Sequence, residues 1–457
     1  MSIDTLADLR TLRGRFGGAL YAPGYPGWDE ARAPWQRAVD QHPAAVVYPE
    51  NEKDVVVAVQ AAEELGLRVA PQATGHNAPP LGALDNTILL RTGAMRAVHI
   101  DAARRRARVR AGALWQDVAG RAAEHGLAAL SGSSPDVGVA GYSLGGGVGW
   151  FGRRYGLQAN RVTAVELVTA DGQLVRADDE YEPDLLWALR GGGGSFGVVT
   201  ALEFELVPVR SVYAGALVWD WRDAGPVLLR FSEWAQTASD LITTAARLLQ
   251  LPDLPMVPAP LRGRQIVMIV GAYVGDPDDA DKVLEPLRRL RPELDTFATM
   301  PAAGLQRLQG DPEHPTAGVT EHRMLAELPR DAVEAFVTVA GPGSGSPLLA
   351  ADLRQLGGAM GRRPEAHGAI SHFDGAFAMF TAGLAIDDDL MLASITHACL
   401  LANTMEPWCA PRRYLNFEEH PSDASRFFDD ETHRRLRSIK ARVDPRNVIH
   451  ANHPIEP

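Results

Sequence analysis

Cysteine and lysine are scarce in this chain of 457 residues, and both shortages restrict its chemistry. Cys399 and Cys409 are the only two cysteines, which excludes a disulfide framework and a zinc cluster of thiolates. Nearly every cation is an arginine, because lysine occurs only as Lys53, Lys282 and Lys440. Few candidates therefore remain for a Schiff-base mechanism or for the lysine of a phosphate-binding P-loop.

Positive charge and long apolar runs are lacking as well. The 45 Lys and Arg residues are outnumbered by 57 Asp and Glu, a net charge of −12, so no basic surplus exists to replace the counterions of a nucleic acid. No apolar run approaches the length of a membrane span, and the first residues contain no apolar signal segment. We therefore expect a cytoplasmic protein that acts on a small molecule, with neither a nucleic-acid nor a membrane partner.

The length of the chain and the distribution of its glycines predict two domains. A chain of 457 residues exceeds one ordinary core, and the dense glycine clusters end near residue 210. The predicted fold class is α+β, with a first domain over 1–210, a second over 211–409 and a C-terminal segment over 410–457. The alternation of helices and strands in the second domain predicts one sheet with helices covering one of its faces.

Periodicity and capping residues, such as Asn51 at the start of the segment 51–67, place the individual elements. Helices are expected within 1–42 and over 51–67, 115–125, 183–190, 226–235, 280–290, 347–356 and 431–443. Strands are expected over 44–48, 68–71, 86–90, 97–101, 106–111, 127–130, 162–169, 173–176, 197–207, 214–219, 265–274 and 369–380. The turn at 170–172 predicts a hairpin between the strands that flank it.

Residues 131–157 contain nine glycines and almost no side chain able to do acid–base work. Glycine at this density lets the backbone approach a flat or phosphorylated ligand closely. Interleaved apolar residues argue against a flexible linker. We interpret the stretch as the wall of a large cofactor site, with 131–146 as a loop.

Two short motifs fall inside this stretch, and the surrounding sequence supports neither. Residues 147–152 match the dinucleotide fingerprint G-x-G-x-x-G, with Glu166 as a possible ribose contact, but no strand precedes them and no good helix follows. Residues 141–145 match G-x-S-x-G around Ser143, but the glycines that follow would break the required helix. A serine hydrolase using Ser143 stays as the alternative from another enzyme class.

The loop at 71–80 has the composition of an anion-binding turn. Ala73, Thr74 and Gly75 are small, so successive backbone N–H groups there could bind a pyrophosphate. His76 follows directly. On composition alone, a hydrogen-bonding or metal-binding role for His76 is more common than covalent attachment of a cofactor.

Four motifs in order resemble the flavoproteins of the berberine bridge enzyme type, in the wider vanillyl-alcohol oxidase family. They are ATGH at 73–76, the glycine-rich stretch, LWALRGGGGSFGVVT at 186–200, and YLNF at 414–417 followed by IKARVDPRN at 439–447. The resemblance covers about 40–210 and 410 to the end. It implies FAD bound by a PCMH-type domain of two subdomains, and a more divergent middle domain that binds the substrate.

The resemblance also implies how the flavin is held. The histidine of the ATGH loop bonds to the flavin ring in this family, which makes His76 the expected attachment point, although Gln72 stands where arginine is usual. A second link from cysteine is not expected, because that position is Ser134 and a hydroxyl is a poor nucleophile. The matching flavin positions are Gln72, Ala73, Thr74, Gly75, His76, Asn77, Ser134, Asp136, Val137, Gly138, Gly141, Tyr142, Gly147, Gly197, Val199, Asn416 and Asn447.

The implied reaction is hydride transfer from a substrate carbon to the flavin, which needs a base above the flavin face. Tyr414 matches the family's Y-x-N tyrosine and is expected to be the base or its hydrogen-bonded partner, with His372 as the other candidate. Val137 resembles a gate that admits dioxygen, so an oxidase is expected and a dehydrogenase with another acceptor is the alternative. An alcohol, a sugar or a secondary metabolite would each fit as substrate, and a non-catalytic flavin-binding protein is the third possibility.

Overall fold

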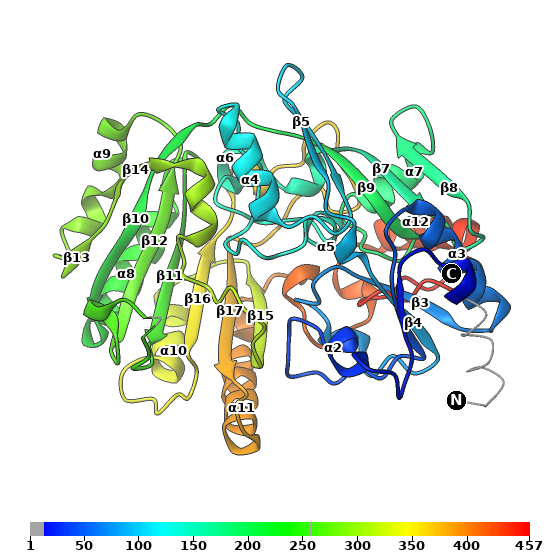
Figure 1. The fold of residues 1–457 in the computed structure, drawn as a ribbon. Helices are drawn as coiled ribbons and strands as arrows, with labels where there is room; N and C mark the ends of the chain where they lie inside the picture. Colours follow the sequence, from blue (N-terminus) through cyan, green and yellow to red (C-terminus); the bar gives the residue numbers. More distant parts are fainter. Residues whose placement is uncertain (1–12, 256) are drawn as a thin grey trace.

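The computed structural model describes residues 13–255 and 257–457, and Figure 1 shows its mixture of helices and sheets. Within 1–42, where a helix was expected, the described residues contain α2 (Trp28–Arg32), and residues 1–12 lie outside the described residues. Three sheets organise the described chain. None of the helices in these ranges is both long and apolar enough to cross a membrane.

The first sheet has the order β1-β2-β4-β3 and is parallel except at β1. Its elements are β1 (Ala19–Tyr21), β2 (Ala45–Tyr48), β3 (Arg68–Gln72) and β4 (Thr87–Arg91), with helices α2 (Trp28–Arg32) and α3 (Glu52–Glu64). The expected N-cap of α3 is confirmed, because Asn51 accepts hydrogen bonds from the N–H groups of Lys53 and Asp54. β3 ends at Gln72, and the ATGH loop follows it directly.

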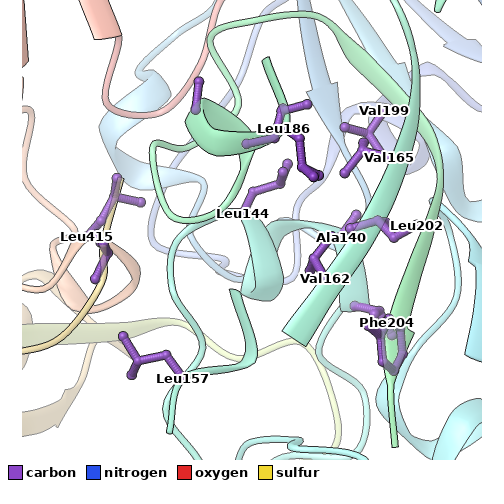
Figure 2. Packing of buried hydrophobic residues seen from close by; sticks show 14 of the residues in the cluster. Ala140, Leu144, Leu157, Val162, Val165, Leu186, Val199, Leu202, Phe204 and Leu415 are labelled. Atoms are coloured by element: carbon purple, nitrogen blue, oxygen red, sulfur yellow. The ribbon is translucent and has the colours of Figure 1, made fainter. Parts of the chain in front are cut away.

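The second sheet is antiparallel, in the order β5-β6-β9-β7-β8. Its elements are β5 (Val98–Asp101), β6 (Arg106–Arg110), β7 (Val162–Val168), β8 (Leu174–Asp178) and β9 (Val198–Glu205), with helices α4 (Trp115–Glu124), α5 (Val139–Leu144), α6 (Gly152–Tyr155) and α7 (Pro183–Leu189). The expected hairpin is confirmed as β7 and β8. Figure 2 shows the core beneath this sheet, where Val165 and Leu202 lie near Leu144 of α5 and Leu186 of α7.

The third sheet has eight strands, and helices cover one of its faces, as expected. Its strands are β10 (Ser211–Asp220), β11 (Ile242–Gln250), β12 (Gln265–Tyr273), β13 (Leu294–Asp295), β14 (Ala298–Pro301), β15 (Gly318–Leu325), β16 (Ala350–Gln355) and β17 (Phe377–Leu384); its helices are α8 (Ala224–Ala235), α9 (Pro277–Arg288), α10 (Arg330–Ala340) and α11 (Asp388–Met405). Part of the opposite face packs against Leu130, Trp150 and Phe151 from the first part of the chain.

The C-terminal residues return to the first two sheets. The last helix, α12 (Asp430–Val443), packs Leu436 and Ile439 into the core of the second sheet. Beyond it, Ile449 forms a parallel bridge with Val69 of β3. The fully buried Lys440 lies 2.5 Å from Asp444 and donates to the Ser195 carbonyl at 2.9 Å, so an ion pair fixes this end of the chain to the loop after α7.

Four expected elements differ in the structure. The helix expected at 347–356 is strand β16, because its backbone pairs with both β11 and β17 and tertiary pairing overrides the local apolar spacing. The strand expected at 369–380 begins only at Phe377, which leaves His372 in the preceding loop. Only an isolated bridge between Ala128 and Val207 replaces the strand at 127–130. The stretch expected as loop contains α5, a helix of six residues.

Candidate cofactor and active site

A cavity of about 530 Å³ lies where the ATGH loop, the glycine-rich stretch, the third sheet and the C-terminal segment meet. This volume falls in the range of small-molecule and cofactor sites. Strands β3, β11, β16 and β17 each contribute to the wall or lead directly into it. Residues far apart in the chain therefore converge on one space.

The ATGH loop presents free backbone donors to this cavity. The carbonyls of Thr74 and Gly75 accept hydrogen bonds from Trp35 and Gln36 at 2.9 and 3.2 Å, which fixes the loop against the N-terminal segment. The backbone N–H groups of residues 73–77 donate to no protein acceptor in the described part of the chain. Successive free N–H groups of this kind form an anion-binding nest, so the loop fits a pyrophosphate.

The glycine-rich stretch approaches its neighbours too closely for side chains at several positions, two of which face the ATGH loop and the tail. A Cβ on Gly145 would overlap the Asn416 carboxamide, and one on Gly138 would come within 3.0 Å of the Ala73 Cβ. A Cβ on Gly141, in contrast, would meet nothing within 4 Å. The stretch therefore packs tightly on the ATGH loop and the tail while it leaves open space on the cavity side for a large flat ligand.

His76 is oriented by two neighbours in the wall. Its ring stacks on Trp35 with centroids 4.0 Å apart, and its Nε2 lies 3.4 Å from Asp136 Oδ1. Asp136 also accepts from Trp35 Nε1 at 2.6 Å and from Ser134 Oγ at 2.8 Å. Burial alone would raise the pKa of Asp136, but these donors and the nearby imidazole hold that pKa below its ordinary value. Asp136 is therefore an ionised acceptor facing one nitrogen of His76.

Tyr414 lies fully buried in the same cavity. Its phenol oxygen accepts hydrogen bonds from the N–H groups of Gly147 and Val148 at 3.1 and 3.2 Å, and from Asn416 Nδ2 at 3.0 Å. Burial raises the pKa of Tyr414 to about 12, against the opposite effect of these three donors and of the Arg354 charge. Three N–H donors around the phenol oxygen would thus stabilise a phenolate, whereas burial of the side chain disfavours the charged form.

The cavity wall contains most of the residues expected at the flavin. These are Gln72, Ala73, Thr74, Gly75, His76, Asn77, Ser134, Val137, Gly138, Gly141, Tyr142, Gly197, Val199, Tyr414 and Asn416. Asn416 joins two of them, because its Nδ2 donates to the Tyr142 carbonyl at 2.9 Å and also to the Tyr414 oxygen.

Four expected site residues lie outside this wall. Asp136 stands behind His76, and Gly147 contributes its N–H to Tyr414. Asn447 turns the chain after α12 with a φ of 55°, and its carbonyl accepts from Arg68, whereas Asn452 is the tail asparagine in the wall. His372 lies in a separate small depression.

The surroundings of His372 are polar and distinct from those of Tyr414. Its Nδ1 lies 2.8 Å from Ser371 Oγ and its Nε2 3.4 Å from Asp374, which also pairs with Arg412. The adjacent Phe373 packs on the Tyr414 ring at 5.1 Å. The structure therefore brings His76 and Tyr414 into one cavity and leaves His372 in another.

Sequence reasoning missed the polar residues that the third sheet and the tail add to the cavity. Arg247, Asp352 and Arg354 lie on β11 and β16, and Glu419 follows the YLNF motif. Burial raises the pKa of Glu419 to about 7, although Gln36 donates to its carboxylate at 3.3 Å. The sequence indicates a shared face for Asp352 and Arg354 only when 347–356 is interpreted as a strand, because alternate residues of a strand face the same side.

One group of described residues has the spacing of a metal site, namely Glu321, His322 and Glu418. Both carboxylates already pair with arginine, Glu321 with Arg323 at 2.7 Å and Glu418 with Arg413 at 2.6 Å. Burial lowers the pKa of His322 to about 4, and its Nε2 accepts the Tyr414 backbone N–H at 3.2 Å. The two carboxylates are therefore neutralised by arginines and need no metal ion, and the group supports the backbone beside Tyr414.

The two rejected motifs have structural roles instead. Ser143 is fully buried on α5 with an unpartnered Oγ among the described residues, so it lacks the exposure that a nucleophile on a sharp turn requires. Glu166 lies on β7 and pairs with Arg108 at 2.6 Å. Neither residue lines the cavity.

Comparisons with known proteins agree with this arrangement. A family described as FAD binding domain matches residues 43–178, and one described as berberine and berberine like matches 413–456. The chain is 36% identical over 203 residues to (R)-6-hydroxynicotine oxidase of Paenarthrobacter nicotinovorans, 44% of each chain. It is 32% identical over 216 residues to glucooligosaccharide oxidase of Sarocladium strictum, 46% of this chain and 43% of that one.

In these matches the chain spans about half the length of the curated relatives. A solved structure extends the likeness to the whole fold. 6-Hydroxy-D-nicotine oxidase from Arthrobacter nicotinovorans superposes with a TM-score of 0.83 at 25% identity, over 96% of this chain and 98% of that one. The chain therefore contains a segment that matches an FAD binding domain and a segment that matches the berberine-like family, on a fold of the PCMH-type FAD-binding proteins, and the relatives that it resembles are FAD-linked oxidoreductases.

Proposed function

We propose that this protein is an FAD-dependent oxidase that removes a hydride from a C–H bond of a small molecule and passes the electrons to dioxygen. The observation that carries the proposal is that one cavity joins the free N–H groups of residues 73–77, His76 and the buried Tyr414. An anion nest, an attachment point and an acid–base group are what a flavin oxidase needs from its protein. Bound FAD would supply the hydride acceptor.

The ATGH loop and the glycine-rich stretch would hold FAD. The N–H groups of residues 73–77 fit the pyrophosphate, and the open space beside Gly141 fits the flat ring system. A dinucleotide of this size also needs the tail, where Asn416 and Asn452 line the cavity. The matching FAD binding domain supports this assignment.

We assign the covalent attachment of FAD to His76 alone. Asp136 faces Nε2, so a hydrogen bond there would place the proton on Nε2 and leave Nδ1 free as the nucleophile. Stacking on Trp35 restricts rotation of the ring. Ser134 donates its hydroxyl to Asp136 at 2.8 Å, and a hydroxyl in that position supplies no second link.

Tyr414 is the proposed proton acceptor for the substrate. Three N–H donors to its oxygen would stabilise the phenolate, as in an oxyanion hole. The Arg354 charge acts in the same direction. With its pKa near 12 the phenol favours substrates whose own proton is released as the C–H bond breaks, such as an alcohol.

The oxidase assignment rests on Val137 and on the relatives. Val137 is a small side chain in the cavity wall, which leaves room for dioxygen beside the flavin. The two curated relatives and the solved structure are named oxidases of a hydroxynicotine or a glucooligosaccharide. A dehydrogenase with a different acceptor is the alternative.

Anaerobic titration with a panel of alcohols, sugars and cyclic amines tests the function. We expect one class to bleach the flavin absorbance near 450 nm, roughly stoichiometrically, and readmitted air to restore the colour with release of peroxide. Slow recovery in air together with fast recovery on adding a dye would indicate the dehydrogenase. Purified yellow protein that no substrate bleaches would contradict both.

A further inference from the structure

The third sheet closes the cavity with a mostly apolar surface that contains one unusual cation. This surface, termed the sheet wall, consists of the residues of β11, β16 and β17 that line the cavity. Its apolar members include Leu249, Phe380 and Ala382, and its charged members are Arg247, Asp352 and Arg354. The two arginines differ sharply in how their charges are satisfied.

Arg247 makes two short hydrogen bonds and lies near a second carboxylate. Its Nε donates to Asp352 Oδ1 at 2.8 Å, its guanidinium donates to the Gln309 carbonyl at 2.9 Å, and Asp311 lies 3.8 Å away. Both Arg247 and Asp352 are almost fully buried. This is a closed internal pair that needs no ligand.

Arg354 has only one partner among the described carboxylates, Asp352, which also accepts from Arg247. One terminal nitrogen lies 3.4 Å from Asp352 Oδ2, at the long end of hydrogen-bonding distance. Its Nε is buried and has no hydrogen-bond partner among the residues that the structure describes. The guanidinium carries five N–H donors, four of them on the two terminal nitrogens, and the single long bond to Asp352 leaves most of those four for a ligand that enters the cavity.

Arg354 is nevertheless held in place. Its guanidinium carbon lies 5.3 Å from the Phe380 ring centroid and 5.0 Å from that of Phe417, and both distances are typical of cation–π contacts. A planar cation fixed by aromatic rings has lost its freedom before any ligand binds, which lowers the entropic cost of binding. Arg354 is therefore a preorganised and under-satisfied cation.

We propose that Arg354 binds a carboxylate group of the substrate, so that the substrate is a small carboxylic acid with an apolar or aromatic body. The proposal rests on the proposed oxidase function and adds its substrate class. A guanidinium matches a planar carboxylate through two parallel N–H bonds. A phosphate dianion would be matched poorly, because the second arginine of the sheet wall is already engaged by Asp352.

Arg354 and Tyr414 both lie close to the ring of Phe417. The Arg354 guanidinium carbon is 5.0 Å from the Phe417 ring centroid, and the Tyr414 ring centroid is 4.8 Å from it. A carboxylate bound by Arg354 would therefore lie within the length of a small molecule from the proposed proton acceptor. The body of the substrate would lie against the apolar residues between them, with the oxidised carbon several bonds from the carboxylate.

Binding of matched acid and amide probes tests the proposal on the purified holoprotein. The probes are benzoate against benzamide and phenylacetate against phenylacetamide, measured by calorimetry at low ionic strength. The wild type should bind each acid at least tenfold more tightly than its amide, because a charge-assisted pair is lost with the amide. Arg354→Gln should reduce this ratio to about one, and Arg354→Lys should retain only part of it because it keeps the charge without the fork.

Arg362→Gln is the matched control, because Arg362 is 64% exposed and pairs with Asp240 at the surface. It should keep the full wild-type preference. A wild type that binds acid and amide equally would overturn the proposal, even if Arg354→Gln failed to fold. A folded Arg354→Gln variant that kept the preference would overturn it too.

The flavin spectrum of the same preparations separates this proposal from the proposed function. Yellow protein that substrates bleach, but that has no preference for carboxylates, would refute the carboxylate subsite alone. Colourless protein that still prefers carboxylates through Arg354 would refute the oxidase and uphold the subsite.

Discussion

Replacing Asp136 by asparagine should slow the proposed attachment of FAD to His76 without preventing FAD from binding. The Asp136 carboxylate lies 3.4 Å from His76 Nε2 and accepts from Trp35 Nε1 at 2.6 Å. Asparagine preserves the size of the side chain and one oxygen for Trp35. It removes the negative charge that would hold the proton on Nε2 and leave Nδ1 nucleophilic.

The magnitude follows from the lost interaction. His76 Nε2 makes no hydrogen bond among the described residues; one that forms to the Asp136 carboxylate during attachment would contribute about 1.5–3 kcal/mol, and the present separation of 3.4 Å favours the lower end. Because a difference of 1.4 kcal/mol changes a rate about tenfold, we expect attachment in the Asp136→Asn variant to be roughly 10–30 times slower.

The assay follows acid-stable flavin during reconstitution of the apoprotein with FAD. Samples are precipitated with acid at intervals, and flavin is measured in the pellet and in the supernatant. Asp29→Asn serves as the control, because Asp29 is 84% exposed and remote from His76 in its contacts. Attachment at the wild-type rate in Asp136→Asn would refute the role of this carboxylate, and loss of all flavin would assign it to binding instead.

Three further substitutions probe the site and the fold. Tyr414→Phe should slow substrate-dependent flavin bleaching by about 10²–10⁴-fold at unchanged flavin content. Because the pKa of Tyr414 is near 12, the wild-type rate should rise with pH up to at least about pH 10, whereas the variant rate should not. Equal pH profiles would show that Tyr414 is not the base. Burial raises the pKa of Glu419 from 4.5 to about 7, so the folded state keeps a proton that the unfolded state releases. The free energy of unfolding should therefore fall as the pH rises from 4.5 to about 7. Glu419→Gln should abolish this fall, and in denaturant titrations at pH 8 its free energy of unfolding should exceed that of the wild type by on the order of 1–3 kcal/mol. Lys440→Ala leaves Asp444 buried without its cation and should cost about 3–5 kcal/mol, whereas the 78% exposed Lys282 should tolerate alanine within about 0.5 kcal/mol.

Local signals were sufficient where a segment carries its own structural information. The Asn51 cap predicted α3, and the turn at 170–172 predicted the hairpin of β7 and β8. The ATGH loop could be interpreted as an anion-binding turn because three small residues in succession leave the backbone accessible. These features depend on near neighbours in the chain.

Features set by tertiary pairing could not be predicted in this way. Residues 350–355 have apolar positions that also suit a helix, and only their pairing between β11 and β17 makes them a strand that turns Asp352 and Arg354 into the cavity. His372 was a candidate as a histidine on the strand expected at 369–380, and the loop that replaces the start of that strand places it outside the cavity of Tyr414. No local pattern specifies which sheet face a distant strand will present to a site.

The central claim is that His76 holds FAD covalently in this cavity, and acid precipitation of the purified protein tests it most directly. We predict flavin absorbance that stays with the wild-type pellet and moves to the supernatant in His76→Ala. Colourless protein that gains no flavin on refolding with FAD, or flavin that stays in the pellet of His76→Ala, would contradict the account.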